Sequence, residues 1–394
     1  MALQFELTNL QRKYLGLDLV EDTWDIVQIN EEVFLYFDND IIRKQIKVTN
    51  DSYHECEMNE ATESNRTILL PKTSRGKRQK LNLTSIEQRN GHGVYFYFGS
   101  NGIQIASYTT QTTFYSTTGD KKDYKSFTDL VNWIDQWINE TTERDMADLE
   151  QFKKSERKHI KYKEGDFFAF KIGRREYGFG RILLDIGKLR KNQEFVNGKN
   201  YGLLNYMGKP LIVKVYHIIS SNSSIDIGEL ADCSAFPSQS IMDNNIYYGE
   251  YAIIDNRKLA LEELDFPISY SKSIDFRDKT TVYLQYGLIY QETDLSKFNK
   301  HLTGKVIKTS ENHQYQETNP YSNIGIGFGL DILLNIGIMK KCIEEKSNQP
   351  FWNSDIYTVK HDLRNPALAP IKQELFDYFG LDPNASYSEN LAKL

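Results

Sequence analysis

Residues 161–183 read KYKEGDFFAFKIGRREYGFGRIL, and this stretch decides the fold of the middle of the chain. The pair Gly165-Asp166 ends a lysine-rich approach with a turn, and an apolar, aromatic run of strand length follows over 167–172. A polar stretch with one glycine then suits a short hairpin loop, and 177–184 supplies the return strand. The pattern therefore predicts a β-hairpin on which a sheet can be built.

Two glycines of the return strand allow two interpretations. Gly178 and Gly180 lie two positions apart, so both belong to one face of the strand, where the missing side chains let a backbone or a large ring approach closely. They either accommodate packing in a core hairpin or expose backbone to a partner. We favour the structural role, in which the glycines shape the sheet and Arg181 fixes an edge or a turn.

Length and composition describe a globular protein of more than one domain. The chain has 394 residues, 40% of them hydrophobic and 26% charged, and it is too long for one ordinary core. Aromatic residues reach 13%, which favours strands and half-buried surfaces. The net charge of −6 argues against a general nucleic-acid binder.

Cysteine usage and the lack of long apolar runs indicate a cytoplasmic protein. Cys56, Cys233 and Cys342 are far apart and form no CxxC motif, which is typical of a reducing compartment. The residues MALQFEL at the start lack the basic and apolar regions of a signal peptide. The longest apolar candidate, 324–339, is broken by glycines and polar residues, so we expect no membrane partner.

A β-rich N-terminal domain is expected over 1–125. Alternating runs predict hairpins over 33–48 and 94–108, and the second turns at Asn101-Gly102, the strongest short hairpin signal. A further strand is expected near its end, in a stretch rich in Thr and Tyr.

One long or broken helix is expected over 126–158, and it would connect this domain to the next. Ser126 is a suitable N-cap and Asp129 suits the helix dipole. Apolar residues in the first half recur at spacings of three and four on one face: Phe127, Leu130, Val131, Ile134, Trp137 and Ile138.

A β-rich central domain is expected over 159–295. Beyond the hairpin, we expect strands at 211–219, 246–254 and 282–290, with a turn at 255–256.

A mostly helical C-terminal part, packed on the central domain, is expected over 296–394. Its helices are expected at 324–345 and at 371–379, the latter ending at Gly380. The fold class is therefore α+β, with an antiparallel β-rich N-terminal domain and its long helix, a central bent antiparallel sheet or half-barrel, and C-terminal helices.

Charge is uneven along the N-terminal domain. Residues 1–63 contain 14 Asp and Glu against 5 Lys and Arg, whereas residues 72–80 contain five cations and no acid: Lys72, Arg75, Lys77, Arg78 and Lys80. A solvated loop is the favoured interpretation of the basic run, because no aromatic residue interleaves it. A nucleic-acid module that uses this run and the basic exit of the helix, 153–163, is the minority interpretation.

Metal and nucleotide motifs are absent from the sequence, and we expect no cofactor. The seven histidines form no HxH, HExxH or Cys/His pattern: His54, His92, His159, His217, His301, His313 and His361. The run His54-Glu55-Cys56-Glu57 looks ligand-like, but a structural or surface role is favoured. The glycines of GIGFG, 325–329, lack the G-x-G-x-x-G spacing and suit close helix packing better.

A catalytic constellation is equally missing at the level of sequence. A hydrolase of phosphoesterase type, with a site assembled only in the fold, stays open as the alternative. A buried cleft that gathers two or more histidines with carboxylates would favour that enzyme, whereas an exposed tyrosine-rich surface would favour a binding protein.

The hairpin resembles the opening of the immunity protein 26 family of bacterial polymorphic toxin systems. The residues that carry the resemblance are Gly165, Asp166, Phe168, Phe170, Tyr177, Gly178, Phe179, Gly180 and Arg181. A second likeness lies at 249–270, although the family often has Trp after the glycine where this chain has Glu250-Tyr251. The likeness covers the central region, about residues 160–292.

The resemblance implies an immunity protein, not an enzyme, that acts in bacterial competition. Such a protein binds and neutralises a cognate secreted toxin inside the cell by direct contact. A basic nuclease is one candidate toxin, and we hypothesise that residues 1–63 supply the acidic surface that meets it. The motif residues are expected to be mainly structural, and the sequence does not indicate which residues touch the toxin.

Overall fold

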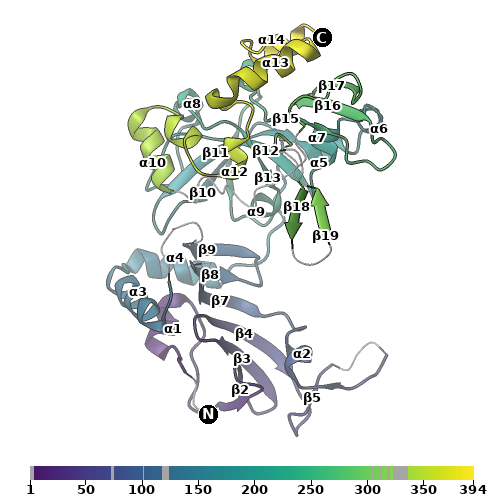
Figure 1. Ribbon diagram of the computed structural model, residues 1–394. Helices are drawn as coiled ribbons and strands as arrows, with labels where there is room; N and C mark the ends of the chain where they lie inside the picture. Colours follow the sequence, from purple (N-terminus) through teal and green to yellow (C-terminus); the bar gives the residue numbers. More distant parts are fainter. Residues whose placement is uncertain are drawn as a thin grey trace. The chain divides into compact units, whose positions relative to one another are not determined.

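The computed structural model describes residues 4–71, 75–100, 102–117, 124–302, 306–309, 313–316, 320–322 and 336–394, without the side chains of 306–309, 313–316 and 336. The chain divides into two compact units (Figure 1). Unit 1 comprises Met1–Ile160 with Tyr248–Glu250, and unit 2 comprises Lys161–Tyr247 with Tyr251–Leu394. Antiparallel sheets and helices occur in both, so the expected α+β class is confirmed.

Unit 1 is built on a seven-stranded antiparallel sheet in the order β1-β2-β3-β4-β7-β8-β9. The strands are β1 (Asp25–Gln28), β2 (Val33–Asp38), β3 (Ile41–Val48), β4 (Tyr53–Ala61), β7 (His92–Gly99), β8 (Gly102–Ser107) and β9 (Thr112–Ser116). Both predicted hairpins are present, as β2–β3 and β7–β8. Smaller elements are α1 (Asn9–Leu15), α2 (Leu83–Ile86) and the ribbon of β5 (Ile68–Leu69) and β6 (Gln79–Lys80).

The segment 126–158 forms two helices, α3 (Phe127–Asn139) and α4 (Glu143–Lys153), not one continuous helix. Thr142 breaks the run because its backbone is extended and its side chain accepts a hydrogen bond from the backbone N–H of Asp145, which starts a new helix. The buried face of α3 is Leu130, Ile134 and Trp137, as the spacing predicts, and it belongs to one cluster with strands β7 and β8.

Unit 2 contains a five-stranded antiparallel sheet in the order β13-β12-β11-β10-β14. Its strands are β10 (Asp166–Lys171), β11 (Tyr177–Asp185), β12 (Pro210–Val215), β13 (Gln239–Met242) and β14 (Ala252–Asn256). The founding hairpin of the sequence is β10–β11, paired from Phe167 with Arg181 to Lys171 with Tyr177. The register shifts at Phe167/Phe168 and at Ile182/Leu184, and such bulges bend a sheet.

A second, three-stranded sheet consists of β15 (Ile268–Lys272), β16 (Thr281–Tyr286) and β17 (Ile289–Asp294). The single strand expected over 282–290 is therefore wrong: the chain turns at Gly287, whose φ of 57° is in the left-handed region. The strand expected over 246–254 is wrong in its first half, where α9 (Asn244–Tyr247) forms. The turn expected at 255–256 is wrong because both residues belong to β14 and pair with β10.

The remaining elements of unit 2 are short, apart from two helices. They are α5 (Ile186–Leu189), α6 (Gln193–Asn197), α7 (Tyr201–Leu204), α8 (Ile227–Asp232), η1 (Leu261–Glu263), β18 (Val306–Thr309), β19 (His313–Gln316), α10 (Ile336–Glu345), α11 (Gln349–Trp352), α12 (Tyr357–Lys360), η2 (Pro366–Leu368), α13 (Ala369–Phe379) and α14 (Tyr387–Ala392). Helix α13 matches the prediction and ends at Gly380, whose φ is 75°. Of the helix expected over 324–345, residues 324–335 lie outside the described residues, and the rest is α10.

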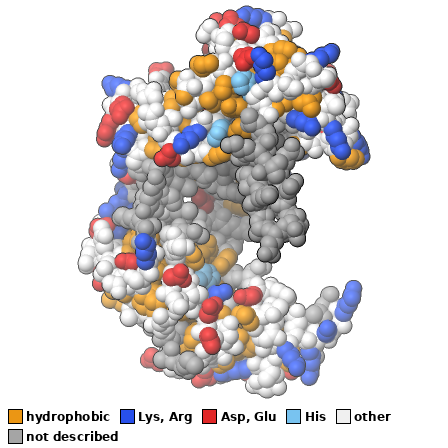
Figure 2. All heavy atoms as spheres, in the orientation of Figure 1, with side chains coloured by type: hydrophobic (Ala, Val, Ile, Leu, Met, Phe, Trp, Pro, Cys, Tyr) orange, Lys and Arg blue, Asp and Glu red, His pale blue; other side chains and the backbone are white. Residues whose placement is uncertain are grey.

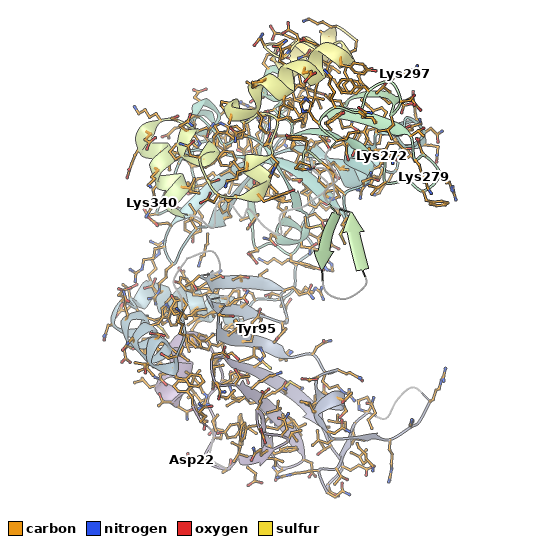
Figure 3. All side chains as sticks on the ribbon, in the orientation of Figure 1. Asp22, Tyr95, Lys272, Lys279, Lys297 and Lys340 are labelled. Atoms are coloured by element: carbon orange, nitrogen blue, oxygen red, sulfur yellow. The ribbon has the colours of Figure 1, made fainter. Side chains whose placement is uncertain are left out.

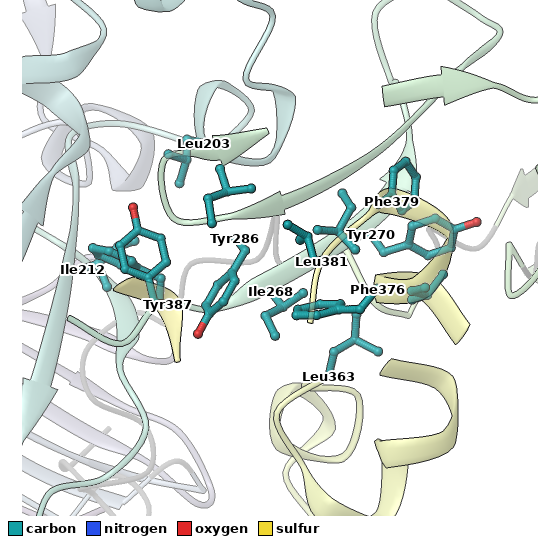
Figure 4. Close-up of a cluster of buried hydrophobic side chains, with 14 of the residues drawn as sticks. Leu203, Ile212, Ile268, Tyr270, Tyr286, Leu363, Phe376, Phe379, Leu381 and Tyr387 are labelled. Atoms are coloured by element: carbon teal, nitrogen blue, oxygen red, sulfur yellow. The ribbon is translucent and has the colours of Figure 1, made fainter. Parts of the chain in front are cut away.

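One face of the three-stranded sheet packs against the C-terminal helices (Figure 4). Ile268 and Tyr270 of β15 and Tyr286 of β16 share a cluster with Phe376 of α13 and Tyr387 of α14. Burial of such side chains contributes roughly 1.5–3 kcal/mol each. The C-terminal helices are therefore part of the core of unit 2.

Candidate functional site

The two motif glycines lie under aromatic rings of the neighbouring strand. Phe168 pairs with Gly180 and Phe170 with Gly178, and both rings lie across β11. A Cβ at Gly180 would lie 2.3 Å from Cζ of Phe168, and one at Gly178 would lie 2.5 Å from Cζ of Phe170. Tyr251 stacks on Phe168 with 5.7 Å between the ring centroids. Glu250 and Tyr251 are the residues that follow Gly249 where the family often has a tryptophan. The glycine backbone is thus covered by side chains of the same unit.

The start of the hairpin is held by a network around Asp166. Its carboxylate accepts hydrogen bonds from the backbone N–H of Lys163 and from Nδ2 of Asn256, each at 2.7 Å. Gly165 has a φ of 88°, and a Cβ there would lie 2.3 Å from the carbonyl oxygen of Arg257. These contacts join the hairpin to the segment that follows β14.

The two aromatic motif residues of β11 differ in burial. Phe179 is fully buried in a cluster with Tyr216 and Leu230. Tyr177 is half-buried, and its backbone pairs with Ser220.

Arg181 is completely buried and fastens an irregular segment to the sheet. Its Nη1 donates to Oε1 of Glu263 at 2.5 Å, and its Nη2 donates to the carbonyl oxygen of Arg257 at 2.7 Å. The guanidinium carbon lies 4.5 Å from the ring centroid of Phe167. Arg181 therefore ties β11 to residues 257–263.

Glu263 is held in its charged form by this arrangement. Burial alone would raise its pKa, but the backbone N–H of Ala260 and the guanidinium groups of Arg257 and Arg181 donate to the carboxylate. Together they lower the pKa of Glu263 to about 2.

Arg364 makes the corresponding connection for the C-terminal part. It donates to Asp265 and Asp362, each at 2.7 Å, and to the carbonyl oxygen of Ser238 at 2.7 Å. Burial alone would lower the pKa of Arg364, but the two carboxylates raise it. The guanidinium stays charged and joins residues 238 and 265 to the loop before α13.

Unit 1 contains a separate buried ion network. Nζ of Lys44 donates to Glu55 at 2.7 Å and to Glu57 at 2.9 Å, and Nε of Arg12 donates to Glu55 at 2.8 Å. Tyr53 donates its hydroxyl to the same carboxylate of Glu55. Burial would raise the pKa of Glu55, but the two cations lower it. Glu55 and Glu57, two of the 14 acidic residues of 1–63, are therefore paired inside the fold and do not contribute to an acidic surface.

Four acids of 1–63 that form no ion pair with another described residue lie around one edge of the sheet. Glu21, Asp22, Glu31 and Glu32 flank the edge strand β1, are exposed, and form no ion pair within the described part of the chain. We call these four residues the acidic edge of unit 1.

The basic run lies on the arm between β5 and β6. Figure 2 shows Lys and Arg side chains gathered there. Arg75, Lys77, Arg78 and Lys80 are exposed, Arg78 pairs with Glu63 at 3.4 Å, and Lys72 lies outside the described residues. The solvated-loop interpretation matches this exposure.

The histidines with described side chains have ordinary partners. Those with hydrogen bonds to named groups are His54 with Tyr108, His92 with Thr109, His217 with Ser234, His301 with Glu374 and His361 with the carbonyl oxygen of Tyr357. His159 lies against the ring of Tyr248, and the side chain of His313 and the run 325–329 lie outside the described residues.

Clusters of metal ligands and the cysteine thiols were the other candidates for chemistry. No group of three or more His, Cys, Asp or Glu is placed to hold a metal ion within it. All three cysteines are free thiols, and burial raises the pKa of Cys56 to about 12.

A loop that the sequence analysis did not single out presents large apolar side chains to solvent. Residues 273–280 join β15 to β16, and in this loop Phe276 is 73% exposed and Ile274 is 59% exposed. Neither side chain belongs to any of the hydrophobic clusters of the described residues. The available signal was a run of turn-forming Ser and Asp interrupted by Ile and Phe.

Hydrogen bonds of Ser273, Asp275 and Asp278 hold the same loop together. Oγ of Ser273 accepts from the backbone N–H of Asp275, and Oδ1 of Asp275 accepts from the backbone N–H of Arg277. Asp278 accepts from the hydroxyl groups of Thr281 and Tyr201 at 2.6 and 2.8 Å. Ser273, Asp275 and Asp278 are thus engaged within the loop, whereas the two apolar side chains are exposed.

Exposed cations surround this loop. Lys272, Arg277, Lys279 and Lys297 are exposed, and none forms an ion pair with another described residue. Figure 3 shows Lys272, Lys279 and Lys297 on the same side of unit 2. The strand register places Lys272 and Lys297 at the same end of the sheet. Lys272 of β15 pairs with Val282 of β16, and the neighbouring Thr281 pairs with Asp294 of β17, three residues before Lys297.

The model of the immunity protein 26 family matches residues 163–280. This segment contains the hairpin, the whole five-stranded sheet, β15 and the loop 273–280. No curated protein and no solved structure shows significant similarity to the chain. Among the described residues, no helix is long and apolar enough to span a bilayer.

Proposed function

We propose that the protein is a cytoplasmic immunity protein that binds a cognate secreted bacterial toxin and neutralises it by direct contact, without catalysis. The observation that carries the proposal is the match of residues 163–280 to the immunity protein 26 family. Within this segment the motif residues are engaged in holding the sheet, so binding falls to the exposed surface around them.

The binding unit in this proposal is larger than the matched segment. The match ends at Thr280, directly before β16, although β15 pairs with β16 over five residues from Ile268 to Lys272. The apolar face of that sheet is covered by α13 and α14. We therefore propose that all of unit 2 acts together.

A basic nuclease is the toxin class that the acidic edge of unit 1 suits. Glu21, Asp22, Glu31 and Glu32 would increase the association rate with a basic partner, in a manner that falls with salt. This proposal fails if a chain that begins near Asp123 binds the toxin with full affinity and full salt dependence.

Co-expression tests the main proposal. The genes beside this one are first searched for a toxin domain, and that domain is then produced in a bacterial host with and without this protein. We expect growth to be rescued and the two proteins to be purified as one complex. Toxicity that persists, with no complex formed, would contradict the proposal. Protection by a toxin-modifying activity, with no stable complex, would contradict its mechanism.

A further inference from the structure

We propose that the loop 273–280 is the anchor by which this protein grips its toxin, with Ile274 and Phe276 inserted into an apolar pocket that has an acidic rim. The inference rests on the proposed function and adds the contact residues and the chemistry of the partner. It begins from the exposure of the two side chains, 59% for Ile274 and 73% for Phe276.

Neither side chain is part of a hydrophobic cluster among the described residues of unit 2. The loop closes through hydrogen bonds of Ser273, Asp275 and Asp278. A buried phenylalanine removes on the order of 150–250 Å² from water, so a partner that covers Phe276 gains most of what an interface hot spot supplies.

The hydrogen bonds within the loop favour tight binding. Asp278 is fixed from two sides, by Thr281 at the start of β16 and by Tyr201 of α7. A loop that is already ordered loses little conformational entropy on association, so more of the contact energy appears as affinity. The loop therefore has the properties of a preorganised anchor.

The positive charge near the loop indicates that the rim of the partner's pocket is acidic. Lys272, Arg277 and Lys279 lie in or next to the loop, Lys297 follows β17, and all four are exposed without an ion pair to another described residue. The guanidinium carbon of Arg277 lies 5.0 Å from the ring centroid of Phe276. A partner that covers Phe276 would therefore also lie close to this cation. Acidic groups around an apolar pocket complement this arrangement.

A protein fits this surface better than a single-stranded nucleic acid. Nucleic-acid grooves stack successive bases on several aromatic side chains, whereas here one ring stands beside an aliphatic side chain. The net charge of −6 also disfavours a polyanion. The pair of Ile and Phe is a typical anchor for an apolar protein pocket.

The test measures binding of the full chain to the catalytically inactivated form of the toxin domain that the co-expression experiment identifies. Phe276→Ala is expected to weaken binding about 30-fold, mainly through faster dissociation, and Ile274→Ala with Phe276→Ala on the order of 100-fold or more. The matched control is Met207→Ala, because Met207 is also 73% exposed in unit 2 and lies outside the loop. Its effect is expected to be less than about twofold.

A second set of variants tests the rim. Lys272→Glu with Lys279→Glu is expected to slow association about tenfold at low salt and to reduce the dependence on salt. The control is Lys340→Glu, on the other side of unit 2 in Figure 3, where we expect no change in association. Unchanged thermal unfolding of every variant shows that the fold is intact, because none of these side chains is buried.

The outcomes separate this inference from the proposed function. If the unaltered protein fails to bind and to protect, the proposed function is wrong. If it binds and protects but Phe276→Ala binds equally well, the toxin contacts another surface and the inference is overturned. Phe276-dependent binding of a single-stranded oligonucleotide, with toxin binding unaffected, would also overturn it.

Discussion

Lys44 in unit 1 and Arg181 in unit 2 are both fully buried cations, but the carboxylates that compensate their burial come from different distances along the chain. Lys44 finds its carboxylates on the next strand of the same sheet, 11 and 13 residues away. Arg181 finds Glu263 82 residues away, in an irregular segment. Lys44 therefore pairs within a local strand ladder, which Arg12 of α1 joins from 43 residues away, whereas Arg181 fastens a more distant segment to its sheet. The folding of unit 2 therefore depends on more remote sequence.

The strongest test of this difference removes the distant parts. A chain of residues 161–280, which ends with the family match, is expected not to fold, because β16, β17 and the helices α13 and α14 are lost from its core. Residues 161–394 are expected to unfold cooperatively. Circular dichroism during urea titration distinguishes the two. A cooperative transition for 161–280 would show that the matched segment is self-sufficient.

Lys44→Met breaks the local network of unit 1. It leaves Glu57 without a cation and Glu55 with only Arg12, so we expect a loss of about 3–5 kcal/mol in the free energy of unfolding. Tryptophan fluorescence reports on unit 1, since three of the four tryptophans lie there. The control is Lys47→Met, whose pair with Glu87 is exposed and 3.7 Å long, with an expected effect below about 1 kcal/mol. Equal effects would remove the distinction between buried and exposed pairs.

Arg181→Lys tests the long-range connection in unit 2. An ammonium group cannot reach Glu263 and the carbonyl oxygen of Arg257 in the same planar geometry, so we expect a loss of about 2–3 kcal/mol. Arg257→Lys is the control, because Arg257 also bonds Glu263 but is largely exposed, and less than about 1 kcal/mol is expected. The measurement is urea unfolding followed by circular dichroism. A variant as stable as the unaltered protein would mean that Arg181 fastens nothing.

Gly180→Ala sharpens the comparison within the hairpin. Its new Cβ would meet the ring of Phe168 and, at 2.8 Å, the backbone oxygen of Lys214, which cannot turn aside, so we expect a loss of about 1–3 kcal/mol. Gly178→Ala meets only the side chains of Phe170 and Ile172 and is expected to cost less. The order of the two unfolding free energies is the readout, and the reverse order would contradict the packing argument.

The smallest effect is a difference in acid sensitivity. Burial lowers the pKa of His54 in unit 1 from 6.5 to about 4. Between these two pH values the imidazole of His54 is protonated in the unfolded chain but not in the folded one. The free energy of unfolding therefore decreases as the pH falls from 6.5 to 4. Glu263 in unit 2, lowered from 4.5 to about 2, loses its contribution as the pH falls from 4.5 to 2.

Two variants separate these windows. His54→Gln is expected to reduce the loss of stability between pH 7 and 5, and Glu263→Gln to reduce the loss only below pH 4.5. Unfolding in urea at several pH values gives both slopes. If Glu263→Gln already changes the slope between pH 7 and 5, the assignment of the acid window to this carboxylate is wrong.

Local pattern predicted the hairpins of unit 1 and the founding hairpin of unit 2. Alternation along 41–48 places Ile42, Lys44, Ile46 and Val48 on the buried face, so even the buried lysine follows from the period of a strand. Helix α13 and its end at Gly380 follow from equally local signals. The errors lie where tertiary contacts overrode an apolar run, as at Gly287, where the chain turns against Phe266.

The candidate surface shows the limit of local pattern. The Ser and Asp residues around Ile274 and Phe276 indicate a turn, but the two apolar residues could equally have packed into the core. The structure shows hydrogen bonds of Ser273, Asp275 and Asp278 within the loop, with both apolar side chains exposed. Exposure is a property of the surroundings, so no spacing along the chain could reveal it.

The sequence by itself determined the α+β class, the hairpin of 166–185 and the resemblance to the immunity protein 26 family, because these depend on residue types and on the period of a strand. Only the tertiary structure decided that Gly178 and Gly180 lie under phenylalanine rings, that Arg181 joins Glu263, and that Phe276 stands free. Those facts depend on which distant segments meet, and such meetings are governed by packing across the whole unit.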